Sequence, residues 1–93
     1  MQLTEQVVFE AAEFRVLHVV GKPGDIIPMH THEARRLLVL CNTSGHVTMR
    51  FPDNTSQGLD FEANTATEIP GPVTHEIVID GLTPIDVWGI EFY

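Results

Sequence analysis

Two histidines separated by one residue, His30 and His32, are the first feature of the sequence that could do chemistry. In an extended strand, side chains at positions i and i+2 point to the same side, so these two imidazoles would lie close enough to share a metal ion. The same alternation places Ile26 and Pro28 beside them. Histidines with this spacing also occur as structural residues with hydrogen-bonded rings, so the pair alone leaves a metal site and a structural role open.

The rest of the chain predicts the strands that would carry such a pair. Short apolar or alternating runs, each ended by Gly, Pro, Asn or Asp, recur along the whole sequence, and no helix of useful length is indicated. This pattern is typical of an all-β sandwich or barrel. Nine strands are expected, at residues 6–10, 14–20, 25–32, 36–41, 45–51, 57–62, 66–70, 74–79 and 84–92.

Turn-forming residues separate these strands. The stretch GKPG at residues 21–24 predicts a turn, and PDNTSQG at residues 52–58 predicts a hairpin. NTSG at residues 42–45 predicts a second hairpin loop, ending in a glycine that can adopt positive φ.

The last expected strand is apolar on both sides. Trp88, Ile90 and Phe92 share one face, and Ile85 and Val87 share the other. In so small a chain, this pattern indicates that either a second subunit or another sheet covers the strand.

A longer pattern contains the histidine pair. The stretch GDIIPMHTHEARRLLVLCNTSG and the later stretch NTATEIPGPVTHEIVI resemble the two motifs of the cupin superfamily, a glycine followed by HxH and Glu, and a glycine followed by PxGxxH and Asn. In the second motif, Asn64 stands where the glycine belongs, and Asn is the next best residue at positive φ. The resemblance extends from Gly24 to Ile79 and implies an all-β, compact jelly-roll (cupin-type) β-barrel of about nine short antiparallel strands. It implies a single cupin domain over residues 1–93.

The same resemblance implies that His30, His32 and His75 are metal ligands. The family's Glu ligand would fall at position 36 or 37, where this chain has Arg36 and Leu37. Among cupins, a three-histidine set without this Glu is known from iron dioxygenases acting on thiols and β-diketones. The expected cofactor is a divalent transition metal, with Zn, Fe, Ni, Mn and Cu all left open because imidazole suits several of them about equally.

Arg36 is the candidate substrate-binding residue. If it starts a strand in which alternate residues such as Leu38 face the barrel, its guanidinium enters the cavity, where it would bind a substrate carboxylate or phosphate or take the place of the metal. Alternatively, it turns outward and pairs with Glu33 or Glu76. The outward geometry is preferred because a cation inside an empty barrel is costly without a counter-charge. A register shift of one residue would exchange the roles of Arg35 and Arg36.

Other polar residues are weaker candidates. Glu33 and Glu76 each directly follow a candidate ligand, so strand alternation predicts that they face solvent. His18 alternates with apolar residues and is expected to be a core histidine, and His46 is expected to be exposed and outside any site. None of these residues is an obvious general base, so any catalysis would depend mainly on the metal.

Composition excludes several classes of partner. With 13 acidic residues against 5 Lys and Arg, the formal net charge is -8, which would repel nucleic acid and anionic membrane surfaces. Cys41 is the only cysteine, so no intrachain disulfide forms; a buried thiol and a reducing, cytoplasmic location are expected. The N-terminal stretch is acidic and has no apolar run long enough for a signal peptide, so no targeting segment is expected there.

Two functional hypotheses remain open, and the sequence does not decide whether the protein is an enzyme. In the first, a small metal-binding cupin acts as a dioxygenase, isomerase or hydrolase on a small oxygen-rich molecule such as a diketone, keto acid or sugar acid. In the second, the protein is a non-enzymatic ligand-binding or sensor module with a metal-free or side-chain-filled barrel. Because cupins of this size are often homodimers, the expected partners are a small-molecule ligand and a second copy of the chain.

Overall fold

The computed structural model describes residues 1–93 and contains nine strands and no helix. No segment forms a helix long and apolar enough to cross a membrane. Each observed strand begins and ends within one residue of its predicted range. The strands are β1 (Gln6–Glu10), β2 (Phe14–Gly21), β3 (Ile26–His32), β4 (Arg36–Cys41), β5 (Gly45–Arg50), β6 (Ser56–Phe61), β7 (Thr65–Pro70), β8 (Val73–Ile79) and β9 (Ile85–Phe92).

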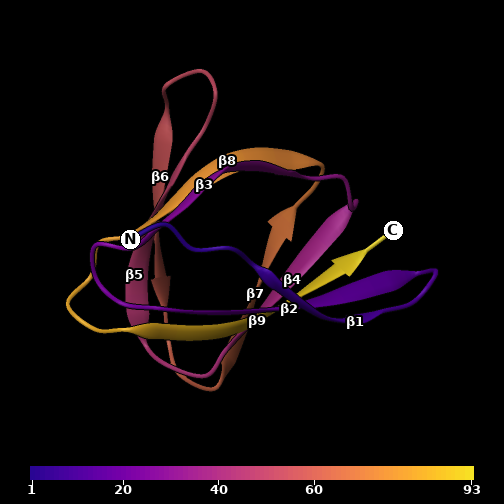
Figure 1. Cartoon of the computed structure of the whole chain (residues 1–93), viewed down its shortest axis with the longest axis horizontal. Coiled ribbons are helices and arrows are strands. Elements are labelled where there is room, and N and C mark those ends of the chain that lie inside the picture. Colours follow the sequence, from indigo (N-terminus) through magenta and orange to yellow (C-terminus); the bar gives the residue numbers. More distant parts are fainter.

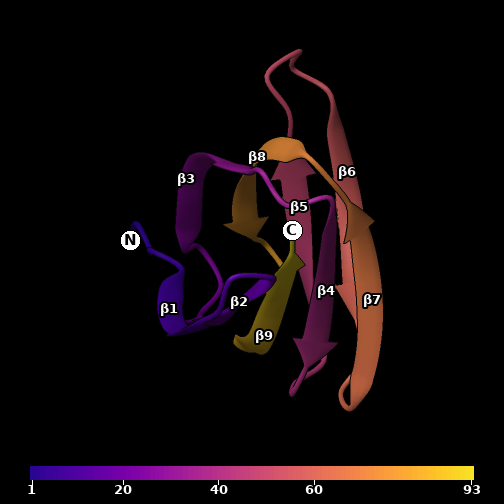
Figure 2. The same ribbon diagram turned by 90° about the vertical axis from the view of Figure 1, so that its right-hand side faces the viewer.

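The strands form two antiparallel sheets that enclose a barrel interior. One sheet has the order β1-β2-β9-β4-β7 and the other β3-β8-β5-β6. Figure 1 shows β3 and β8 side by side on one side of the barrel, with β2 and β9 on the other, and Figure 2 shows the same arrangement after a turn of 90°. Most connections pass from one sheet to the other, as in a jelly roll.

The turns are confirmed in part. Asn64 has a φ of 64°, as its motif position predicts, and Gly24 in the predicted turn at residues 21–24 has a φ of 95°. Residues 52–58 form the expected hairpin between β5 and β6. Residues 42–45 do not form a hairpin, because β4 and β5 belong to different sheets. Gly45 does not have positive φ; instead, a Cβ atom there would lie 2.7 Å from a methyl carbon of Ile85.

Alternate residues of the strands fill the space between the sheets. One group of buried side chains comprises Val19, Ile27, Leu37, Val39, Cys41 and Val87, and a second comprises Val47, Ile79 and Ile85. Cys41 is 3% exposed, as expected, and desolvation by burial raises the pKa of its thiol. The thiol therefore remains protonated and behaves as a small apolar side chain.

Strand β9 lies at the centre of the five-stranded sheet, and its two faces differ as the sequence predicts. Ile85 and Val87 are buried against the opposite sheet, whereas Trp88, Ile90 and Phe92 form a half-buried outer face. A strand that is apolar on both faces could be covered by a second subunit or by another sheet, and the second sheet accounts for its inner face. The same inner face also carries Gly89 and Glu91, so an acidic side chain points into the barrel from the end of β9.

Candidate metal centre

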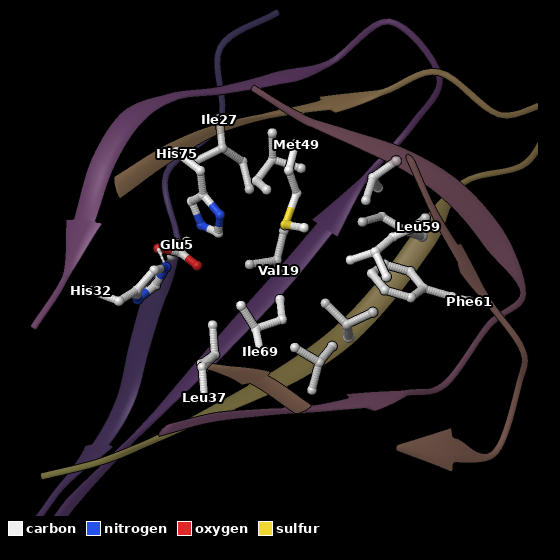
Figure 3. Close-up of a pocket in the computed structure, with 15 residues that line it drawn as sticks. Glu5, Val19, Ile27, His32, Leu37, Met49, Leu59, Phe61, Ile69 and His75 are labelled. Carbon is white, nitrogen blue, oxygen red and sulfur yellow. Dashed lines mark ion pairs between the residues drawn. The ribbon is translucent and has the colours of Figure 1, made fainter. Parts of the chain in front are cut away.

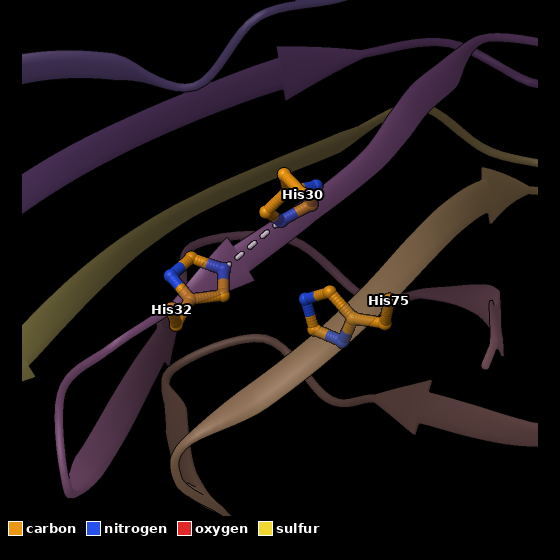
Figure 4. A group of neighbouring side chains, drawn as sticks. All are labelled: His30, His32 and His75. Atoms are coloured by element: carbon orange, nitrogen blue, oxygen red, sulfur yellow. Dashed lines mark hydrogen bonds between the residues drawn. The ribbon is translucent and has the colours of Figure 1, made fainter. Parts of the chain in front are cut away.

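Three histidines converge at one end of the barrel, between β3 and β8. His30 and His75 are directly opposite each other in the antiparallel pairing of these strands, and His32 lies two residues further along β3. One nitrogen of each ring lies within 4.8 Å of the corresponding nitrogens of the other two. Figure 4 shows the three rings turned toward one another. Strand register therefore brings together the three histidines singled out in the sequence.

A β-bulge in β3 decides which residues share the inner face with the histidines. Between Ile27 and His30 the strand contains one residue more than its partner β8. The extra residue reverses the alternation, so Ile27 faces the interior and Pro28 is exposed. The expectation that Ile26 and Pro28 lie beside the histidines is therefore wrong. The proline is the sequence signal for this irregularity, because it cannot donate a hydrogen bond to the sheet.

The three histidines differ in burial. His32 and His75 are each 2% exposed, whereas the His30 side chain is 22% exposed and lies at the rim. Desolvation by burial, with a smaller contribution from the charges of His30 and His32, lowers the pKa of His75 to about 4. His75 is therefore neutral at neutral pH, which is the state in which an imidazole nitrogen can bind a metal.

Hydrogen bonds orient two of the rings. Nδ1 of His30 donates to the carbonyl oxygen of Pro28 at 2.7 Å, and Nδ1 of His32 donates to Oε2 of Glu91 at 2.9 Å. These bonds direct both Nε2 atoms toward the shared space, where they lie 3.0 Å apart, at hydrogen-bonding distance (Figure 4). A bond between them needs a proton on one Nε2, and a bound metal would replace that proton. Fixing the tautomer in this way is how proteins prepare histidines for metal binding.

Glu91 is itself held in place by Arg15. The two residues are opposite each other in the pairing of β2 with β9, and both Nε and Nη2 of Arg15 lie 2.6 Å from Oε1 of Glu91. Glu91 is 1% exposed, so this ion pair offsets the cost of burying its carboxylate. Glu91 is not among the site residues predicted from the sequence. The available signal was its position on the same face of the last strand as the apolar Ile85 and Val87.

A second acid, Glu5, reaches the histidines from the segment that precedes β1. Its Oε1 lies 3.2 Å from Nε2 of His30 and 3.5 Å from Nε2 of His32. The sequence offers no signal for this approach, because Glu5 lies outside the predicted strands and far from the histidines along the chain.

The third histidine lacks a partner on its second nitrogen. Nδ1 of His75 is buried and makes no hydrogen bond. Buried polar atoms are nearly always paired in folded proteins, so this nitrogen marks a place where the protein alone does not satisfy its own polar groups. A set of three imidazoles, two oriented by hydrogen bonds and one unpaired, fits the donor preferences of a divalent transition metal.

A cavity of about 60 Å³ extends from the histidines into the barrel. Twelve of its fifteen lining residues are hydrophobic. Figure 3 shows His32, His75 and Glu5 grouped at one side of this cavity, with Leu59 and Phe61 at the other. The cavity therefore has one polar end, which contains the candidate ligands, and one apolar end.

Comparison with solved structures identifies the architecture. A cupin domain from Bordetella pertussis Tohama I superimposes with a TM-score of 0.83 at 19% sequence identity, covering 97% of this chain and 92% of that one. The chain has the cupin fold. An RmlC-like cupin with a double-stranded β-helix fold from Methanocaldococcus jannaschii has a TM-score of 0.74 at 12% identity, covering 96% of this chain and 78% of that one.

A third similar structure is an uncharacterized conserved protein with a double-stranded β-helix domain from Klebsiella pneumoniae. Its TM-score is 0.73 at 18% identity, and the match covers 96% of this chain and 75% of that one. No protein-family model matches the sequence, and no curated protein matches it. At these identities the similarity establishes the cupin fold alone.

In this cupin fold, Arg36 does not reach the histidines. Its side chain is 60% exposed, its Nη2 lies 2.7 Å from Oε1 of Glu68, and its guanidinium carbon lies 5.9 Å from the ring centre of Phe92. The outward, paired geometry that we preferred is therefore the one present. The partner is Glu68 on β7, however, and neither Glu33 nor Glu76.

The alternation of β4 explains this position. Leu37 is 4% exposed and lines the cavity, whereas Leu38 is half-buried on the outer face of the sheet. The assumption that Leu38 faces the barrel is thus wrong, because the inward face begins at Leu37. Arg35 is also exposed, so neither arginine lies beside the histidines. Where the cupin motif would place an acid, the inward position of this strand is apolar.

The remaining histidines lie outside the cluster. His18 is satisfied, with Nε2 2.7 Å from Oδ1 of Asp86 and its ring stacked 4.0 Å from that of Trp88, but it lies on the outer face and not in the core. His46 is partly exposed and its Nδ1 lies 2.6 Å from Oδ1 of Asp80, so its exclusion from the site is consistent with its position. His18 and His46 can therefore serve as control positions in experiments on the three clustered histidines.

Proposed function

We propose that this protein is a small cupin that binds one divalent transition metal through His30, His32 and His75. The observation that supports this proposal most strongly is the orientation of His30 and His32: each ring is held through Nδ1, and the two Nε2 atoms are directed into a shared space. His75, on the facing strand, is neutral because burial lowers its pKa. We further propose that the cupin domain comprises residues 1–93.

A small oxygen-rich molecule would complete the coordination. When bound, the metal would supply Lewis acidity, which polarises a chelating carbonyl or carboxylate oxygen. The chain itself holds His32 in place through Glu91 and Arg15 and lines the cavity mostly with apolar side chains. A cavity of about 60 Å³ has room for about five water molecules, which favours a short keto acid or diketone over a sugar acid. Dioxygenation, isomerisation and hydrolysis are the reaction classes that suit such a site.

Elemental analysis of protein purified without a metal-affinity tag tests the proposal. We expect close to one equivalent of metal in the wild type, none in a His32→Ala, His75→Ala double variant, and an unchanged amount in His46→Ala, which removes an imidazole from outside the cluster. Adding the metal to the stripped wild type should raise the midpoint of thermal unfolding, because only the folded chain contains the site. Protein that carries no metal and whose midpoint ignores added Zn, Fe, Mn, Ni and Cu would contradict the proposal.

The small cavity also supports a second function, a non-enzymatic ligand-binding or sensor module. Twelve of the fifteen residues that line the cavity are hydrophobic, which suits a barrel that binds a ligand, with or without a metal, and does not turn it over. The two functions separate when the metal-loaded protein is incubated with short keto acids and diketones: an enzyme consumes one of them, whereas a sensor shows a change in unfolding midpoint and no consumption.

We propose, in addition, that the protein is a homodimer. The outer face of the five-stranded sheet presents Leu38, Leu40, Trp88, Ile90 and Phe92, all half-buried in the isolated chain. A second copy of this face would cover these side chains and also Val20 on β2, which is 56% exposed. Light scattering tests the proposed dimer: we expect a dimer for the wild type and a monomer for an Ile90→Lys variant. A monomeric wild type contradicts the proposal.

A further inference from the structure

We infer that Glu5 provides a fourth, carboxylate ligand to the metal, in place of the acid that β4 lacks. The inference rests on the proposed function, since it requires the three histidines to hold a metal. In the isolated chain, Oε1 of Glu5 lies 3.2 Å from Nε2 of His30 and 3.5 Å from Nε2 of His32. Both contacts are made to the nitrogens that are left free for a metal.

The spacing of these atoms matches the edges of a coordination polyhedron. Nitrogen and oxygen ligands about 2.0–2.2 Å from one metal ion lie about 2.9–3.5 Å from each other when the bonds meet at 90–109°. The two Nε2 atoms of His30 and His32 are 3.0 Å apart, and the Glu5 oxygen is 3.2 and 3.5 Å from them. These three atoms therefore have the spacing of one face of a coordination polyhedron, and the nitrogen of His75 lies within 4.8 Å of those of His30 and His32.

The segment that carries Glu5 is anchored to the strand that carries the histidines. The amide of Leu3 donates to the carbonyl oxygen of Ile26 at 2.8 Å, and the amide of Ile26 donates to the carbonyl oxygen of Met1 at 2.9 Å. The Leu3 side chain packs against both groups of buried apolar residues. These contacts hold residues 1–3 beside the start of β3 and so restrict the positions that the Glu5 carboxylate can take.

Charge balance also favours an acid at this position. Three neutral imidazoles leave a bound divalent ion with its full charge, and the other nearby carboxylate, Glu91, is occupied by Arg15 and His32. On the β4 side, Leu37 occupies the inward position and offers no donor. Glu5 is thus the one carboxylate within 4 Å of the Nε2 atoms of His30 and His32.

Metal binding to the full chain tests the role of Glu5. Metal-free wild type, Glu5→Gln and Glu33→Gln are titrated with Co²⁺ and with Mn²⁺ in competition with a chelator, and the visible spectrum of each Co²⁺ form is recorded. Glu33 is the matched control, because it is an exposed acid next to His32 that points away from the site. We expect Glu5→Gln to lower Co²⁺ affinity by at least about 10–100-fold, the cost of losing a residue that only supports a ligand, and to change the Co²⁺ spectrum. Mn²⁺ affinity should fall further, since Mn²⁺ depends more on carboxylate ligands.

The outcomes separate this inference from the proposed function. Wild type that binds Co²⁺ while Glu5→Gln binds it with the same affinity and spectrum overturns the role of Glu5 and leaves the three-histidine site standing. Wild type that binds no metal overturns both. A crystal structure of the metal-loaded wild type gives the answer even if Glu5→Gln does not fold: a Glu5 oxygen about 2.0–2.2 Å from the metal supports the inference, and one beyond about 3 Å overturns it.

Discussion

The two ends of the barrel interior use the same strands but have opposite chemistry. On β8, His75 lies at one end and Ile79 at the other; on β9, Glu91 lies at the first end and Ile85 at the second. At the polar end, His32, His75 and Glu91 are each no more than 2% exposed. At the apolar end, Val47, Ile79 and Ile85 pack together with no polar side chain among them.

This difference indicates a division between function and stability. Burying imidazole and carboxylate groups costs free energy that hydrogen bonds and the Arg15 ion pair only offset, whereas burying apolar side chains contributes stability directly. The polar end should therefore be replaceable without unfolding the protein, and the apolar end should be replaceable only at a large cost in stability.

The largest effect is expected when the polar end is made apolar. In His75→Leu, bound metal should be lost completely, while the free energy of unfolding of the metal-free protein should stay the same or rise by about 1 kcal/mol, because an unpaired buried nitrogen is removed. Elemental analysis and urea unfolding measure the two quantities. A variant that loses both metal and several kcal/mol of stability would show that His75 is a structural residue.

The reverse result is expected at the apolar end. Ile79 is fully buried, and Ile79→Ala should lower the free energy of unfolding by about 3 kcal/mol. The folded fraction should still bind one equivalent of metal with wild-type affinity, because no ligand moves. Urea unfolding gives the stability and chelator competition gives the affinity; a loss of affinity larger than about tenfold would contradict the independence of the two ends.

An intermediate effect is expected for the residue that orients His32. Glu91→Gln keeps the size of the side chain but weakens the acceptor for Nδ1 of His32 and removes the charge that pairs with Arg15. Metal affinity should fall by about 10–100-fold, as measured by chelator competition. Stability should also decrease, since Arg15 loses its partner. The Co²⁺ spectrum separates the two roles: it should change if Glu91 orients a metal ligand, whereas a purely structural role would leave it unchanged.

The smallest effect concerns pH at the rim of the apolar end. The hydrogen bond from the amide of Lys22 lowers the pKa of Asp25 below its ordinary value of 3.8. A carboxyl group with a lowered pKa in the folded state stabilises the protein above its unfolded-state pKa, and that contribution is lost as pH falls through the folded-state value. The difference in unfolding midpoint between wild type and Asp25→Asn should therefore be constant from pH 5 to 7 and shrink below about pH 4. A constant difference down to pH 3 would contradict this.

Local sequence features predicted most of the fold. Strand positions follow from alternation and from turn residues such as Gly24 and Asn64, both of which depend on neighbours only a few residues away. The spacing of His30 and His32 is likewise local, and the more distant His75 came from the resemblance to the second cupin motif. The prediction was wrong where one extra residue reverses the inward and outward alternation of a strand: because of the bulge before His30, Ile27 and not Ile26 lies on the inner face.

The sequence by itself therefore determined the nine strands, the all-β class and the three histidines that lie together. Only the tertiary structure decided what surrounds those histidines. Glu91 contacts His32 across 59 positions, and Arg36 pairs with Glu68 across 32. Such contacts depend on which strands become neighbours and on the register between them, which alternation within a single strand does not encode. For this reason the acids that orient and approach the histidines became visible only in the folded barrel.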